Sequence, residues 1–219
     1  PKLRGDTLST MKTLLLVGAA GLVGQSVLPQ ALADPRVAKL VAPTRRPLPP
    51  HPRLENPLVS FDALPADASW WSVDGVICTL GTTIRKAGSR PAFRKVDHDY
   101  PLAVATFARR HGATAFAFTS SVGANAGSSP FYLRTKGETE RDLGTVGFSS
   151  LTIVRPSFIG GVRAERRPLE QIALAFFGRI ARLLPRRYRV VPAERIAQVL
   201  LEATLTAEPG VRIVESEAI

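Results

Sequence analysis

The stretch Leu14-Leu15-Leu16-Val17-Gly18-Ala19-Ala20-Gly21-Leu22-Val23-Gly24 decides the fold. Its first four residues are continuously apolar, as in a strand that is buried on both faces of a parallel sheet. Three glycines at intervals of three follow, and apolar residues then recur at helical spacing over residues 22–32. A buried strand, a glycine turn and a helix in immediate succession predict the first βαβ unit of a Rossmann fold.

Each glycine has a physical reason in such a turn. Gly18 permits the tight turn after the strand, Gly21 lets the backbone approach a pyrophosphate, and Gly24 lets the helix pack on the sheet. The helix start presents free N–H groups and a positive dipole end to the phosphates. We therefore expect a dinucleotide to contact Gly18, Ala20, Gly21, Leu22, Val23 and Gly24. The alternative is a glycine turn that binds no ligand.

Strand and helix patterns alternate along the rest of the chain, which favours further βαβ units. Strands are predicted at residues 12–17, 38–42, 58–61, 73–80, 114–118, 150–155 and 211–214, and the proline-rich residues 43–57 are predicted to be a loop. Helices are predicted at residues 22–32, 93–111, 131–143, 168–184 and 193–205. The expected fold is a three-layer, doubly wound α/β Rossmann fold with a mostly parallel sheet of about seven strands.

The length of 219 residues suits one domain. Residues 1–10 read as a leader or an expression remnant, and residues 11–219 as a single NAD(P)-binding domain. Within it, residues 157–205 are expected to form a small C-terminal extension on the substrate side.

Composition limits the function classes. No apolar run is long enough to cross a bilayer and no secretory signal is recognisable, so we expect a cytoplasmic protein without a membrane partner. The single cysteine, Cys78, excludes an intrachain disulfide and reads as a core residue. The three histidines, His51, His98 and His111, share no ligand spacing with Cys, Asp or Glu, so no metal site is expected.

The formal net charge of +11 allows attraction to polyanions, including nucleic acid. The basic residues are dispersed in pairs such as Arg109/Arg110, without a long basic run or regularly interleaved aromatic residues. We therefore do not expect nucleic-acid binding as the main function, and the expected partner is a small-molecule substrate. A monomer and a homodimer are both compatible with the sequence.

The residues after the second predicted strand indicate which dinucleotide binds. Sites that prefer NAD usually place Asp or Glu there, on the ribose 2′-hydroxyl. Here Pro43-Thr44-Arg45-Arg46 follows the strand, and the guanidiniums of Arg45 and Arg46 suit a 2′-phosphate. We therefore favour NADP(H) over NAD(H), the alternative being that both arginines are exposed loop charges. Asp62 is placed to accept a hydrogen bond from the adenine amino group.

Tyr132 and Lys136 form a Y-x-x-x-K pair on one face of a predicted helix, and Ser120 and Ser121 end the preceding strand. A tyrosine has an ordinary pKa near 10, and a neighbouring lysine ammonium favours its phenolate. Such a phenol can exchange a proton with a substrate hydroxyl or carbonyl while a serine polarises the same oxygen.

Three further stretches accompany these motifs: Cys78-Thr79-Leu80-Gly81-Thr82-Thr83, Val96-Asp97-His98-Asp99-Tyr100 and Arg155-Pro156. Together, the motifs and stretches resemble those of the short-chain dehydrogenase/reductases. Within them the chain is similar to the atypical, NmrA/epimerase-like branch around the Tat-interacting protein. The resemblance runs from Met11 to about Arg167.

The resemblance implies Ser121 as the catalytic serine, Tyr132 as the acid–base and Lys136 on the nicotinamide ribose. It also implies that the cofactor contacts Leu80, Gly81, Thr82, Ser120, Pro156, Ser157, Phe158 and Ile159. The expected function is an NADP(H)-dependent oxidoreductase that transfers hydride to or from a small carbonyl or alcohol. The alternative is a dinucleotide-binding redox sensor or scaffold with little or no catalysis, because the C-terminal third is small.

Overall fold

The computed structural model describes residues 11–160, 187 and 189–219. The expected helix at residues 168–184, and the residues 1–10 read as a leader, lie outside them. Seven parallel strands form one sheet in the order β3-β2-β1-β4-β5-β6-β9. The strands are β1 (Lys12–Val17), β2 (Val37–Val41), β3 (Leu54–Glu55), β4 (Gly75–Cys78), β5 (Ala115–Thr119), β6 (Ser150–Arg155) and β9 (Gly210–Glu215).

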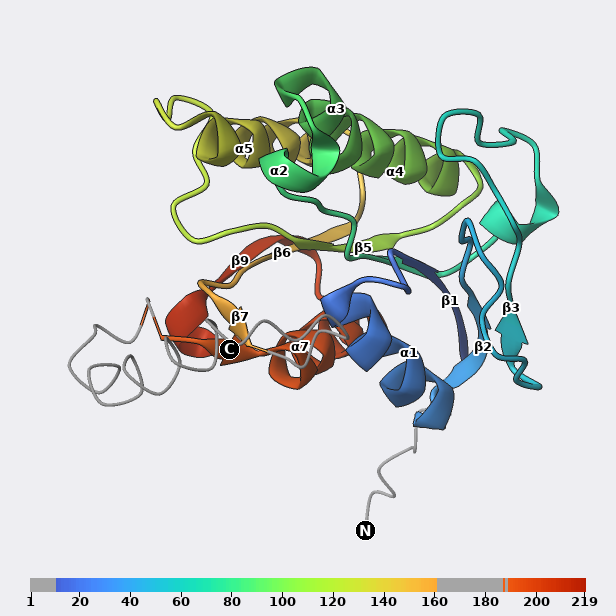
Figure 1. Ribbon diagram of the computed structural model, residues 1–219. Coiled ribbons are helices and arrows are strands. Elements are labelled where there is room, and N and C mark those ends of the chain that lie inside the picture. Colours follow the sequence, from blue (N-terminus) through green and yellow to red (C-terminus); the bar gives the residue numbers. More distant parts are fainter. Residues whose placement is uncertain (1–10, 161–186, 188) are drawn as a thin grey trace, which may run out of the picture.

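Helices cover both faces of the sheet, so the fold has three layers as predicted (Figure 1). One face carries α1 (Leu22–Ala33) and α7 (Ala193–Thr206), and the other carries α3 (Arg90–Arg94), α4 (Tyr100–Arg110) and α5 (Phe131–Gly144). Residues 14–17 of β1 and all of β4 are buried, which explains why these residues are apolar without interruption. A short helix, α2 (Ile84–Ala87), follows β4, and a separate two-stranded ladder joins β7 (Ile159–Gly160) to β8 (Val191–Pro192).

The strand order reverses at β1, because β2 and β3 extend the sheet on one side and β4 to β6 extend it on the other. Doubly wound sheets bind ligands in the crevice at this switch point, beyond the carboxyl ends of the strands. Since all seven strands are parallel, the residues that follow them gather at one edge of the sheet. This geometry places the loops after β1, β2, β4, β5 and β6 along the same edge.

The third strand differs from its prediction. It consists of Leu54–Glu55, inside the expected loop, and Leu58 makes only an isolated bridge with Thr44. The Arg53 side chain fixes this segment by donating to the backbone oxygens of Asp34 (3.0 Å) and Val37 (2.8 Å). A strand between prolines is tolerated here because β3 is an edge strand and needs hydrogen bonds on one side only.

The expected helix at residues 93–111 also differs. It starts earlier, at Arg90, and runs through α3, a π-helical turn over Lys95–Asp99 and then α4. Pro101 lies in the first turn of α4, where a missing N–H is tolerated. It cannot donate to the Asp97 carbonyl, and the Thr139 hydroxyl of α5 lies 3.0 Å from that oxygen and 2.8 Å from the Thr135 carbonyl, so its single proton lies between the two oxygens.

Gly24 is the position where α1 meets the glycine turn. A Cβ on Gly24 would lie 2.1 Å from the Gly18 carbonyl oxygen, a distance that real contacts never reach. We expect Gly24→Ala to lower the free energy of unfolding by about 1–3 kcal/mol, because α1 must move away from the sheet. Urea unfolding measures this change.

Gly144 supplies the matched control. It is also helical, at the end of α5, and a Cβ there would meet no atom within 4 Å. Gly144→Ala should therefore leave the stability unchanged or raise it by up to about 1 kcal/mol. Equal effects of the two substitutions would contradict the packing role of Gly24.

Candidate active site

The glycine turn lies at the switch point of the sheet. Gly18 has φ +89°, a left-handed conformation that glycine adopts without strain, and its carbonyl accepts the Gly21 N–H (2.8 Å). The helix α1 begins directly after Gly21, without a side-chain cap and without an acidic residue in its first turn. Its first N–H groups and positive dipole end are thus open to an anion.

The loop after β4 is bound to this turn. Thr79 donates both its N–H (2.9 Å) and its hydroxyl (3.0 Å) to the Val17 carbonyl. Leu80, Gly81 and Thr82 follow, and the Thr82 N–H donates to Asp97 Oδ2 (2.8 Å). The glycine turn and the Leu80–Thr82 loop therefore lie side by side at the carboxyl edge of the sheet, after neighbouring strands.

Lys136 reaches the crevice from α5 and is almost fully buried. Its Nζ lies 2.9 Å from Asp97 Oδ1, donates to the Thr119 carbonyl (3.3 Å) and lies 4.9 Å from the centre of the Phe118 ring. Burial is the largest single influence and lowers the pKa of Lys136, but the charge and hydrogen bond of Asp97, with smaller effects of Tyr132 and Cys78, together raise it. Lys136 is therefore an ammonium ion at neutral pH.

Tyr132 lies one helical turn before Lys136 and is half-buried. Its ring packs on Phe93 of α3 at a centroid distance of 5.7 Å. The phenol is close enough to raise the pKa of Lys136, so the two side chains interact electrostatically. This arrangement agrees with the helix face that the Y-x-x-x-K spacing predicts.

Ser121 starts a loop that packs against α5. A Cβ on Gly137 would lie 2.2 Å from the backbone of Asn125 and Ala126, so only glycine lets this loop approach the helix so closely. The Asn125 N–H donates to the Leu133 carbonyl (3.2 Å), between Tyr132 and Lys136. The Ser121 loop is therefore anchored to the stretch of α5 that carries both side chains.

Ser120 has a different environment from Ser121. Its hydroxyl donates to Glu140, a buried carboxylate that also pairs with Arg155 (2.5 Å). Arg155 pairs in addition with Glu215 of β9 (2.9 Å), and hydrogen bonding to Glu140 is the main cause that raises its pKa. The Ser120 side chain thus belongs to an ion-pair network between α5, β6 and β9.

The adenine side of the crevice follows β2. Arg45 and Arg46 are exposed, and neither has a carboxylate partner among the residues that the structure describes. The Thr44 hydroxyl donates to the Arg46 carbonyl (2.6 Å) and fixes the turn. Asp62 lies opposite, where it accepts from the Tyr100 hydroxyl (2.6 Å) and pairs with Lys95 (2.5 Å).

The contacts of Asp62 with Lys95 and Tyr100 shift the pKa values of Asp62 and Tyr100. Hydrogen bonding to Lys95, then to Tyr100, lowers the pKa of Asp62. Burial and the Asp62 hydrogen bond raise the pKa of Tyr100 to about 12. An adenine amino group would therefore share the Asp62 carboxylate with Lys95 and Tyr100.

The segment after β6 has the four remaining predicted cofactor residues. Pro156 is buried, and its carbonyl accepts the Val122 N–H (3.0 Å), which connects it to the Ser121 loop. The Ser157 N–H donates to the Ser216 hydroxyl (3.2 Å). Phe158 is 71% exposed and Ile159 36% exposed, in or next to β7, so both present apolar surface beyond the crevice.

Two polar groups of the crevice were not singled out from the sequence. Asp97 appeared only within the stretch that carries the resemblance, and its ion pair with Lys136 joins residues 39 positions apart. The Thr119 hydroxyl, at the end of β5, is buried without a hydrogen-bond partner in the described part of the chain. An unpaired buried hydroxyl at the carboxyl end of a central strand is a candidate to bind a ligand.

Cys78 is fully buried at the end of β4, and burial raises the pKa of its thiol to about 12. It is therefore a core residue, as expected, and not a nucleophile. Among the described residues no group of His, Cys, Asp and Glu could hold a metal ion. No helix in the same ranges is long and apolar enough to cross a membrane.

Known proteins resemble the chain in sequence and in fold, although no protein-family model matches it. Protein HTATIP2 of Rattus norvegicus is 32% identical over 224 residues, which cover 100% of this chain and 92% of the relative. Protein fmp52, mitochondrial, of Emericella nidulans is 33% identical and covers 79% of this chain and 78% of its own. The solved structure of MoeE5 with UDP-glucose and NAD shares the fold at a TM-score of 0.68 and 17% identity, over 92% of this chain and 74% of that one.

These relatives correct one expectation. The prediction of a cytoplasmic location is wrong, because relatives from Emericella nidulans, Candida albicans and Aspergillus fumigatus are named mitochondrial proteins. The prediction rested on the lack of a recognisable secretory signal. That criterion does not distinguish the cytosol from the mitochondrion, since mitochondrial transit segments have a different, amphipathic and Arg-rich character.

The identity to HTATIP2 extends over the whole chain, and the glycine turn, the Leu80–Thr82 loop and the Tyr132/Lys136 helix occupy one edge of a Rossmann sheet. The chain therefore belongs to the atypical short-chain dehydrogenase/reductases, in the branch that contains HTATIP2, and has the dinucleotide-binding oxidoreductase fold of that family.

Proposed function

We propose that this protein is an NADP(H)-dependent oxidoreductase that transfers hydride to or from a small carbonyl or alcohol. The observation that carries the proposal is the buried ammonium group of Lys136, one helical turn from Tyr132 and beside the loop that follows β4. A buried cation next to a half-buried phenol is costly to maintain in a purely structural helix. In a catalytic site the same pair has a use, since it stabilises a phenolate.

A nicotinamide dinucleotide would lie along the carboxyl edge of the sheet, with its pyrophosphate on the uncapped start of α1. The glycine turn, the Leu80–Thr82 loop and the Pro156–Ile159 segment border that path. The bound nicotinamide would supply or accept the hydride. That the solved structure of MoeE5 contains NAD supports a cofactor of this class.

The chain's own residues would handle the proton. Tyr132 would donate a proton to the substrate oxygen during reduction, and take it back during oxidation. Lys136 would stabilise the resulting phenolate through its charge and would hold the nicotinamide ribose. Ser121, on the loop anchored to α5, would donate a hydrogen bond to the same substrate oxygen.

The preference for NADP(H) over NAD(H) rests on the turn after β2. No carboxylate follows this strand directly, and the two exposed guanidiniums of Arg45 and Arg46 have no carboxylate partner in the described ranges. A 2′-phosphate would offer such guanidiniums charge-assisted, bidentate hydrogen bonds. A ribose 2′-hydroxyl would leave this positive charge without a partner.

Replacing Tyr132 by phenylalanine tests the acid–base role. With a carbonyl substrate found by screening, Tyr132→Phe should lower kcat by at least about 100-fold, because positioned proton transfer contributes about 10²–10⁴-fold. NADPH consumption measures the rate. The NADPH affinity and the unfolding midpoint of the variant serve as controls and should stay at the values of the wild type.

Turnover that survives the loss of the phenol would remove Tyr132 from this role. Tight NADPH binding without turnover of any substrate, together with a protein partner recovered with the wild type, would support the alternative of a redox sensor.

Replacing Arg45 by alanine tests the cofactor preference. Arg45→Ala should weaken NADPH binding by roughly 10- to 100-fold, the worth of a hydrogen bond to a charged group, and leave NADH binding unchanged. A fluorescence titration with each dinucleotide measures both affinities.

Arg212→Ala is the matched control, since Arg212 is exposed on the distant edge strand β9 and its loss changes the net charge equally. The NADP(H) preference would be ruled out if the wild type bound NADPH and NADH with equal affinity and neither substitution changed those affinities.

A further inference from the structure

We propose that Asp97 is a positioning residue of the active site, which holds Lys136 in place as an ammonium ion and fixes the Leu80–Thr82 loop at the same time. Its part in the reaction rests on the proposed function. The ion pair itself does not, because it is a direct contact between two side chains of this chain.

The first argument is the geometry of the pair. Asp97 Oδ1 lies 2.9 Å from Lys136 Nζ, and the two side chains are only 1% and 4% exposed. A buried ion pair of this kind contributes little net stability, because removing both charges from water offsets most of their attraction. Stability alone therefore does not explain why these two charges lie in the core beside the crevice.

The second argument is what else Asp97 holds. Its other oxygen, Oδ2, accepts the Thr82 N–H at 2.8 Å. A Cβ on Gly81 would lie 3.4 Å from Asp97 Oδ1 and 3.7 Å from Lys136 Nζ, so the pair lies directly beneath this glycine. One carboxylate thus joins the lysine of α5 to the loop that would contact the dinucleotide.

The third argument is how firmly Asp97 itself is held. It lies in the π-helical turn Lys95–Asp99, and its carbonyl lies 3.0 Å from the Thr139 hydroxyl, which also lies 2.8 Å from the Thr135 carbonyl of α5. Thr139 and Lys136 are neighbours on one face of α5, three positions apart. Backbone and side chain of Asp97 are therefore both attached to the helix that carries the lysine.

Asp97 is the counter-ion of Lys136 in the part of the chain that the structure describes. There, the titratable groups that face the ammonium are Asp97 from the π-helical turn, Tyr132 from its own helix and Cys78 from β4. Cys78 stays a neutral thiol, since burial raises its pKa, and β5 offers only the Phe118 ring and the Thr119 carbonyl. Without Asp97, burial would favour the neutral amine, which cannot stabilise a phenolate.

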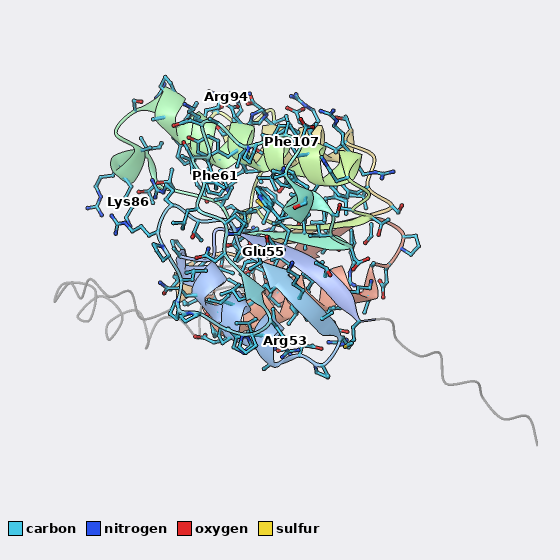
Figure 2. The ribbon with its side chains drawn as sticks, turned by 90° about the vertical axis from the view of Figure 1, so that its right-hand side faces the viewer. Arg53, Glu55, Phe61, Lys86, Arg94 and Phe107 are labelled. Carbon is cyan, nitrogen blue, oxygen red and sulfur yellow. The ribbon has the colours of Figure 1, made fainter. Side chains whose placement is uncertain are left out.

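The experiment is a pH titration of the lysine side chains by NMR, with ¹³C-labelled lysine and no dinucleotide added. The chain has only six lysines, so the Lys136 signal can be assigned with Lys136→Met. Lys86, exposed on α2 and projecting away from the sheet, is the internal reference (Figure 2). In the wild type, Lys136 should lose its proton at a higher pH than Lys86.

Asp97→Asn should lower the titration midpoint of Lys136 by about 1–3 pH units, because the opposite charge is lost while burial remains. Asp99→Asn is the matched control, since Asp99 lies in the same π-helical turn but is 55% exposed and contacts His98. It should leave the midpoint of Lys136 unchanged. The proposal would be overturned if Lys136 of the wild type titrated at a lower pH than Lys86. It would also be overturned if the Lys136 midpoint were the same in Asp97→Asn and Asp99→Asn. The wild-type comparison is valid even if a variant does not fold.

A second readout concerns the reaction. In a turnover assay, Asp97→Asn should move the alkaline limb of the pH–rate profile toward neutral pH, as Lys136 deprotonates earlier. A uniform loss of rate at every pH would overturn the positioning role. If the NMR midpoints are as expected but NADPH does not bind, the proposed function is refuted while the ion pair remains established. The failure of one proposal can therefore be distinguished from the failure of the other.

Discussion

The contact between Gly24 and the Gly18 carbonyl is the constraint on which the architecture depends. It brings α1 against the end of β1 and aims the start of the helix at the switch point of the sheet. Because the strands are all parallel, every loop that could meet a ligand emerges at the edge that this contact organises. The apolar sequences of β1 and β4 follow from the same arrangement, since helices cover both faces.

Much of this fold could be predicted from the sequence. β1 and β6 were predicted to the residue, because Gly18 and Pro156 end the two strands and both strands are rich in apolar residues. The strand β3 was misplaced, because its position depends on the Arg53 side chain and not on local hydrophobicity. The π-helical turn was missed for a related reason, since no periodicity distinguishes five residues inside a longer helix.

The candidate site also has a part that could be predicted from the sequence and a part that could not. The glycine turn and the Tyr132/Lys136 pair are local patterns, and their spacing on one strand, turn or helix can be read directly. The partners of those residues are not local: Lys136 meets Asp97 across two helices, and Asp62 meets Lys95 and Tyr100 from another loop. Ser120 and Ser121 are adjacent in sequence, yet the first is bound in an ion-pair network and the second lies on the loop that packs against α5. Such differences arise from packing and carry no signal in the sequence.

Pro101 has a mechanical consequence. The proline has no N–H to offer the Asp97 carbonyl, and the Thr139 hydroxyl of the neighbouring helix lies 3.0 Å from that oxygen. The same hydroxyl lies 2.8 Å from the Thr135 carbonyl, so a single proton lies between the backbones of two helices. Thr139 and Lys136 belong to one helix, and any shift of that helix along its axis moves both together. An imino acid that touches neither the lysine nor the tyrosine therefore takes part in the packing that positions them.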